Sequence, residues 1–139
     1  MTDSTTRRTR AQHALCLLLT VLGAFQAGLA LGCPWGAASY GGAHRGALPP
    51  RLRAVSGTAS AVYLGTAAYL SSGAGPATVR RRVLSVIAAL MAAGTPANLA
   101  SRSPYERLWA PVTAVAALMA WWARPAATPP LHGTVPTSR

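Results

Sequence analysis

The chain has 139 residues with a formal net charge of +11, from thirteen basic side chains against two acidic ones. All thirteen basic residues are arginine, and they lie mainly at the edges of four uncharged stretches: 11–44, 54–79, 83–101 and 108–123. Arginines that flank apolar segments contact lipid headgroups and set topology, whereas a nucleic-acid protein gathers its charge on one face. We therefore expect no nucleic-acid partner.

The four uncharged stretches predict membrane spans. A transmembrane helix needs roughly 20 mostly apolar residues, and each stretch supplies one or comes close. A soluble alanine-rich bundle would instead need a polar outer face on every helix, which these stretches lack. The sequence therefore predicts an all-α membrane fold, with four transmembrane helices packed as an antiparallel bundle in a single domain, 1–139. Arginine without lysine, with many alanines, glycines and prolines, is typical of a GC-rich bacterial genome.

The first helix is expected at about 11–31, after a flexible, arginine-bearing tail at 1–10. It is also open to reading as a secretion signal, because the residues before Cys33 loosely resemble a lipoprotein cleavage site. Against cleavage, the apolar run is long for a signal and further apolar segments follow. Whether 1–32 are removed stays open at this point.

A Gly- and Pro-rich loop at 32–53 precedes the second helix, at about 53–72, which is the weakest of the four spans. The third helix is expected at about 82–100 and the fourth at 104–123, with Pro111 kinking the fourth and a disordered tail at 125–139. With the N-terminus inside, eight arginines fall on the inner side and five on the outer side. The bias predicts a multi-pass protein of the cell membrane with both termini in the cytoplasm.

Helical projection divides the spans into large and small faces. Because lipid tails are as apolar as leucine, small residues that allow close backbone approach should meet in the bundle. The large faces are expected to point to lipid: Leu15, Leu18, Leu22, Phe25 and Leu29; Val83, Ile87, Leu90 and Met91; Leu108, Val112, Val115, Met119 and Trp122. The small faces are expected inside: His13, Cys16, Thr20, Gly23, Ala27 and Ala30; Ser85, Ala89, Ala92, Ala93 and Pro96; Thr113, Ala117 and Ala120. Gly57, Ala61 and Gly65 should form the contact stripe of the second helix.

The most distinctive segment begins at Asn98 and ends at Pro111. Ser103 followed by Pro104 and Glu106 predicts a capping box, in which the serine hydroxyl and the glutamate carboxylate bond each other's backbone amides. The alternative is a functional acid, because Glu106 is the one carboxylate near the spans. Arg107 and Trp109 predict an interfacial anchor.

Other polar residues have simpler interpretations. Asn98 and Gln26 are expected to form interhelical hydrogen bonds, and Arg80, Arg81 and Arg82 to bind anionic lipid headgroups. Cys16 and Cys33 would lie about 25 Å apart on one helix, too far for a disulfide.

The pattern Asn98-x4-Ser103-x-x-Glu106-Arg107-x-Trp109-x-Pro111, before the last of four helices, resembles the small uncharacterised four-helix membrane proteins common in actinobacterial genomes. The resemblance covers about fifteen residues, the overall length and the helix count. It implies a fold and a location, and no activity.

No catalytic group, cofactor site or metal-ligand spacing is evident, so we expect a non-enzymatic protein. The first hypothesis is an interaction or accessory component of the membrane, in contact with the lipid bilayer and with a second copy or a larger membrane partner. The alternative is a small transporter or carrier that uses Glu106 and Arg107 at the outer mouth, with Asn98 nearby.

Overall fold

A computed structural model describes residues 2–126, in which all regular structure is helical and four helices are long. The predicted all-helical class is therefore confirmed, and the predicted disorder beyond residue 126 lies outside the described residues. Two segments are long and apolar enough to cross a membrane, Asp3–Leu31 and Ala77–Leu99. The elements in chain order are α1 Thr2–Leu31, the 3-10 turns η1 Gly36–Ala38 and η2 Tyr40–Gly42, α2 Pro50–Ser71, α3 Ala77–Leu99, α4 Pro104–Arg107 and α5 Trp109–Trp122.

Three helices begin earlier than the hydropathy pattern predicts. The expected flexible tail at 1–10 is helical from residue 2, where Asp3 pairs with Arg7 one turn later at 3.3 Å. Helix α2 begins at Pro50, since proline suits the first helical position. Helix α3 begins at Ala77, so the cluster at 80–82 lies inside its first turns and not ahead of it.

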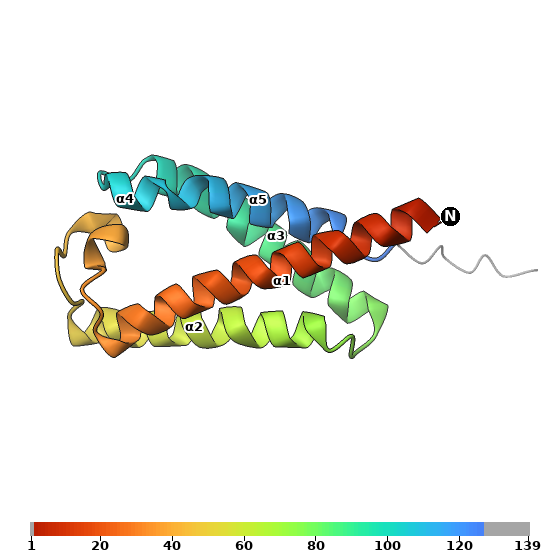
Figure 1. Ribbon diagram of the computed structural model, residues 1–139, viewed down its shortest axis with the longest axis horizontal. Helices are drawn as coiled ribbons and strands as arrows, with labels where there is room; N and C mark the ends of the chain where they lie inside the picture. The colour runs from red at the N-terminus through yellow and green to blue at the C-terminus, as the bar shows by residue number, and fades with distance from the viewer. Residues whose placement is uncertain (1, 127–139) are drawn as a thin grey trace, which may run out of the picture.

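The helices form two antiparallel pairs (Figure 1). Helix α1 packs along α2, and α3 packs along α5, while α1 crosses the second pair through contacts with α5. Helices α2 and α3 are consecutive but make little contact with each other. The loop at 32–49 lies at one end of the molecule, next to α4.

The predicted fourth helix is divided. Its first turn, α4, is separated from α5 at Leu108, and the interruption lies next to the carbonyl of Arg107. Pro111 explains the position, because its nitrogen cannot donate to the carbonyl four residues earlier and its ring crowds that carbonyl. The kink expected from Pro111 therefore appears as a break one turn before it.

The buried core of α1 and α3 differs from the predicted packing at many positions. Leu15 and Leu29 are fully buried and Leu22 nearly so, although all three were expected to face lipid. On α3, Ile87 and Met91 are buried. Six residues expected inside are exposed instead: His13, Thr20, Ala89, Ala92, Ala93 and Pro96. The prediction is correct for Cys16, which is buried, and for Leu90, which is 58% exposed.

Helix α1 has neighbours on two sides, α2 and α5, so its large side chains fill the space between them. On α5 the predicted inner face is correct for Thr113 and Ala120, which are buried.

Helix α1 contacts α2 through side chains that bond backbone carbonyls. Gln12 donates to the carbonyl of Leu70 at 2.8 Å, and Ser60 donates to that of Gly23 at 2.9 Å. Gly23 therefore packs as predicted, and a Cβ there would lie 2.7 Å from the side chain of Leu64.

The predicted stripe on α2 is not the face that meets α1. Gly57 is half-buried near Ala30, but Ala61 and Gly65 are exposed. Ala27 on α1 is half-buried. The buried face of α2 begins with Ser56 and Ser60 and continues along the same side of the helix to Ala67 and Leu70.

Candidate functional site

The segment 101–109 contacts the loop at 32–49 through a polar network, in which Ser103 begins α4. Its hydroxyl accepts the Glu106 amide at 3.3 Å, which is one half of the predicted capping box, and donates to the carbonyl of Ala37. The other half is absent, because the Ser103 amide donates to the hydroxyl of Ser101 at 3.1 Å. The Glu106 carboxylate is therefore free for other donors.

Glu106 uses one carboxylate oxygen to hold the loop. Its Oε2 accepts the backbone amide of Gly41 at 2.9 Å and also the hydroxyl of Ser101. Gly41 lies 65 positions away in sequence, so this contact joins two segments that helical capping rules do not connect. Glu106 therefore makes a tertiary contact as well as lying in the first turn of a helix.

The turn that presents the Gly41 amide needs an unusual backbone. Tyr40, Gly41 and Gly42 all have positive φ, at 50°, 74° and 72°. Glycine adopts this region without strain, whereas a non-glycine residue there is uncommon. At Gly42 the absence of a side chain is also needed for contact, since a Cβ would lie 2.5 Å from that of Ser103.

Trp109 binds the same loop and is not simply an interfacial anchor. Its indole nitrogen donates to the carbonyl of Ala38 at 3.1 Å. Its ring lies 4.6 Å from that of Phe25, which in turn stacks on Trp35 at 5.9 Å. The aromatic contacts connect α5, α1 and the loop.

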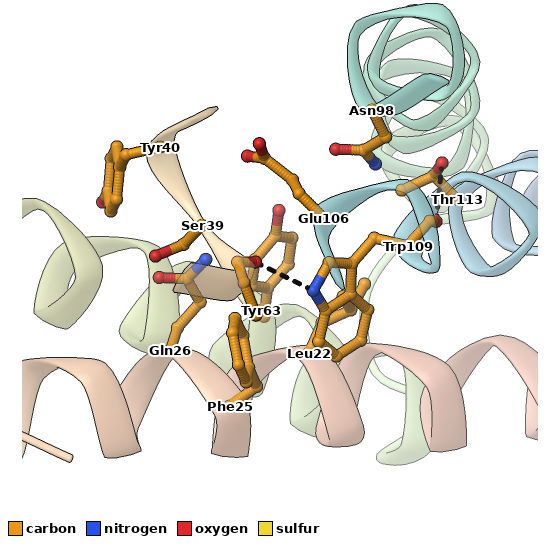
Figure 2. Close-up of a pocket in the computed structure, with 11 residues that line it drawn as sticks. Leu22, Phe25, Gln26, Ser39, Tyr40, Tyr63, Asn98, Glu106, Trp109 and Thr113 are labelled. Carbon is orange, nitrogen blue, oxygen red and sulfur yellow. Dashed lines mark hydrogen bonds between the residues drawn. The ribbon is translucent and has the colours of Figure 1, made fainter. Parts of the chain in front are cut away.

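These contacts line an open pocket of about 250 Å³ (Figure 2). Figure 2 shows the Glu106 carboxylate, the Asn98 amide and the Tyr63 hydroxyl directed toward the same space. The pocket is lined by Leu22, Phe25, Gln26, Ala38, Ser39, Tyr40, Tyr63, Asn98, Glu106, Trp109 and Thr113. A carboxylate, two amides and four aromatic rings therefore share one small cavity.

The two amides do not make the predicted interhelical bonds. The Oε1 atom of Gln26 is buried without a partner, and the Asn98 side chain makes no hydrogen bond within residues 2–126. Helices α3 and α5 are joined instead by Thr95 and Thr113, whose hydroxyls lie 3.1 Å apart. An amide that is excluded from helix packing but lines a cavity is available to a ligand.

The arginines leave Glu106 without an ion pair. Over residues 2–126 the single ion pair is the one between Asp3 and Arg7. Arg107, the neighbour of Glu106, donates to the carbonyl of Ser101 at 2.7 Å. The structure thus separates the predicted pair of Glu106 and Arg107 at the outer mouth, and only Glu106 lines the pocket.

The arginine cluster on α3 lies at the opposite end of the molecule and bonds mainly within the chain. Arg80 donates to the side chain of Gln12 at 2.8 Å, and Arg81 donates to the carbonyl of Pro125 at 2.9 Å. Arg82 is exposed. The guanidinium groups of Arg80 and Arg81 thus bond oxygen acceptors of the chain near the helix ends. Arg82 is therefore the most accessible of the three to a lipid headgroup.

Sequence reasoning missed Ser39, Tyr40 and Tyr63 as pocket residues. Tyr63 could have been found from the sequence, because it continues the face of Ser56 and Ser60 at helical spacing. Tyr40 had no comparable signal, since its place depends on the fold of the loop. Its hydroxyl lies 3.0 Å from that of Ser56.

Comparison of the chain with protein-family models, with curated proteins and with solved structures finds no match. The resemblance to the four-helix actinobacterial proteins therefore stays a prediction.

Proposed function

We propose that the chain is a multi-pass protein of the cell membrane with four spans, a non-catalytic interaction or accessory component of the membrane. The observation that carries the proposal is the exposure of large apolar side chains on all four long helices. The exposed fractions are 66% for Leu17, 54% for Val62, 58% for Leu90 and 51% for Leu118. Further large apolar side chains are exposed on the same helices, among them Val21, Val55, Val86 and Trp121. Soluble monomers seldom expose large apolar patches, whereas lipid tails cover such surface readily.

The placement of charge supports the orientation with both termini in the cytoplasm. The N-terminus of α1, the turn between α2 and α3 with the first turns of α3, and the C-terminal end of α5 lie toward one end of the molecule (Figure 1). These segments carry seven of the described arginines, at 7, 8, 10, 80, 81, 82 and 124. An excess of arginine on one side favours the cytoplasm for that side.

Topology mapping tests the proposal. Variants with Cys16 and Cys33 replaced by serine receive one new cysteine, at exposed Ala43 in the long loop or at exposed Ala74 in the turn after α2. In intact cells an impermeant maleimide should label the cysteine at 43 and spare the one at 74. Labelling of both, or of position 74 alone, would contradict four spans in this orientation, and failure of α2 to insert would be the first cause to examine.

The proposed assembly role is supported by small residues that point away from the fold. Ala61 and Gly65 on α2 and Ala92 and Ala93 on α3 are exposed, so they are free to meet a second copy or a larger membrane partner. In lipid, small residues allow two backbones to approach closely, and a bulky side chain prevents it.

Combined Ala61→Leu and Gly65→Leu replacements should weaken association in mild detergent, measured by crosslinking and by co-purification. Ala24→Leu is the matched control, because Ala24 is exposed on α1 and lies outside the stripe. If the stripe variant and the control associate alike, the stripe is not a contact surface.

A carrier function is the second candidate, and the specific observation in its favour is the Glu106 pocket. An ionisable group that faces a cavity near the membrane indicates a solute pathway by default. Solute uptake into liposomes that contain the wild type or Glu106→Gln separates the carrier from the accessory component, since an accessory role requires no uptake.

A further inference from the structure

We propose that the pocket at Glu106 binds a small organic cation, a protonated primary amine with a short apolar substituent. Neither proposed role assigns this ligand, and binding can be measured in detergent whatever the topology is. The inference rests on three properties of the lining residues: an unpaired carboxylate, a buried acceptor without a donor, and aromatic walls.

The carboxylate is available to a cation from outside the chain. Glu106 is half-buried, one of its oxygens is held by the loop, and its Oε1 makes no hydrogen bond within residues 2–126. Twelve arginines are described, yet none lies within ion-pair distance of this carboxylate. A carboxylate shielded from every intramolecular cation in so basic a chain is suited to a cationic ligand.

The second property selects a cation that carries N–H groups. Gln26 Oε1 is buried and lacks a donor, and leaving such an acceptor unsatisfied is costly. The oxygen is closed to a water-sized molecule, so the Gln26 side chain must rotate toward the pocket to meet a ligand. A primary ammonium carries three donors, enough for Glu106, for Gln26 in that rotated position and for one further acceptor among the lining groups. A quaternary ammonium would satisfy the charge but leave Gln26 unpaired.

The third property favours an organic ligand over a hydrated metal ion. Phe25, Tyr40, Tyr63 and Trp109 line the cavity, and aromatic faces attract ammonium groups and cover apolar substituents. Groups of at least three metal-ligating side chains are absent from the described residues. The volume of about 250 Å³ lies below the usual range for drug-sized ligands, so the substituent is short.

The positive charge of the chain opposes a cation but does not decide the outcome. The lining residues include no arginine, and the nearby Arg107 is directed to the carbonyl of Ser101. Exposed charges farther than about 10 Å are largely screened at 0.1 M salt, whereas the carboxylate would touch the ligand. The same lining argues against an anion, because no basic side chain faces the cavity.

Calorimetric titration of the full chain in dodecylmaltoside with benzylammonium chloride tests the proposal. Benzyl alcohol and benzoate are the neutral and anionic counterparts of the same shape. We expect saturable binding of benzylammonium at one site, and binding of the other two at least about tenfold weaker, the scale of one charge-assisted hydrogen bond. Benzyl alcohol or benzoate binding as tightly as benzylammonium would overturn the proposal.

Three variants locate the site. Glu106→Gln should weaken binding about tenfold or more, because glutamine can keep the loop contacts without the charge. Gln26→Met should weaken it roughly twofold to tenfold, and it removes no hydrogen bond of the folded chain. Asp3→Asn is the matched control, since it removes the other carboxylate, which is exposed near the start of α1, and should leave binding unchanged.

Unchanged binding in both pocket variants, or an equal loss in Asp3→Asn, would refute the site. Circular dichroism reports whether each variant is folded. If Glu106→Gln does not fold, Gln26→Met still tests the site.

A primary ammonium also occurs in the headgroup of phosphatidylethanolamine, so the source of the cation needs its own comparison. Benzylammonium titrations are repeated in nanodiscs of phosphatidylglycerol with and without phosphatidylethanolamine. A lipid source predicts that phosphatidylethanolamine lowers the apparent affinity at least about tenfold in wild type and has no effect in Glu106→Gln. A free amine as the source predicts the same affinity in both nanodiscs. Absence of benzylammonium binding in the nanodiscs without phosphatidylethanolamine would contradict the proposal.

Discussion

Leu15 and Leu17 lie two positions apart on α1 and give a matched test of which face is buried. Leu15 is fully buried and Leu17 is 66% exposed. In water-soluble proteins a buried Leu→Ala costs about 2.7–5.0 kcal/mol, the sum of a transfer term and a cavity term. Leu→Ala removes three carbon atoms with their hydrogens. The free energy of transfer from water is roughly 0.8 kcal/mol for each, or about 2.4 kcal/mol together.

If the protein lies in the membrane as proposed, the unfolded helix is already in apolar surroundings in micelles or lipid, so the transfer term largely cancels. The cavity term remains, which leaves about 0.3–2.6 kcal/mol, and we expect Leu15→Ala to cost about 1.5 kcal/mol. Leu17→Ala should cost less than about 0.5 kcal/mol, as surface substitutions do. Unfolding in mixed micelles of dodecylmaltoside and dodecyl sulfate, followed by circular dichroism, measures both.

Equal losses of stability in the two variants would contradict the burial of Leu15. They would favour the sequence-based prediction, in which Leu15 faces lipid and the small residues face the bundle. A cost above about 3 kcal/mol for Leu15→Ala would mean that the transfer term from water is present, and would argue against a helix that stays in the membrane when the fold opens.

The contacts between the loop and the last helices yield three further predictions. Glu106→Ala should lower the free energy of unfolding by about 1–2 kcal/mol, because it leaves the buried Ser101 hydroxyl without its acceptor, whereas water can reach the exposed Gly41 amide. Glu106→Gln should lower it by less than about 1 kcal/mol, and equal losses of stability would contradict the neutral hydrogen-bonding role. Trp109→Phe keeps the aromatic contact but loses the bond to the Ala38 carbonyl, so we expect a cost of about 1 kcal/mol and faster tryptic cleavage in the loop, with unchanged cleavage as the contrary result. Gly42→Ala should cost more than Gly41→Ala in the same unfolding assay, since both have positive φ but only at position 42 would a Cβ meet another segment; equal costs would show that the loop does not dock against 101–103.

Local signals were sufficient for several features of the fold. Charge-free stretches of helical length locate four helices, because an apolar segment that is removed from water must satisfy its backbone hydrogen bonds internally. Ser103 before Pro104 marks a helix start, since a hydroxyl there accepts an orphan amide whatever the rest of the chain does. Both signals act over a few residues, so the sequence alone carries them.

The buried faces of α1 and α3 and the pocket were decided only by the tertiary structure. A period of 3.6 separates two faces of a helix, but when both are apolar it does not say which one is buried. Leu15 is buried because α2 and α5 flank α1, a fact of helix arrangement. The partner of Glu106 is likewise the amide of Gly41, 65 positions away, and only the folded loop brings the two together.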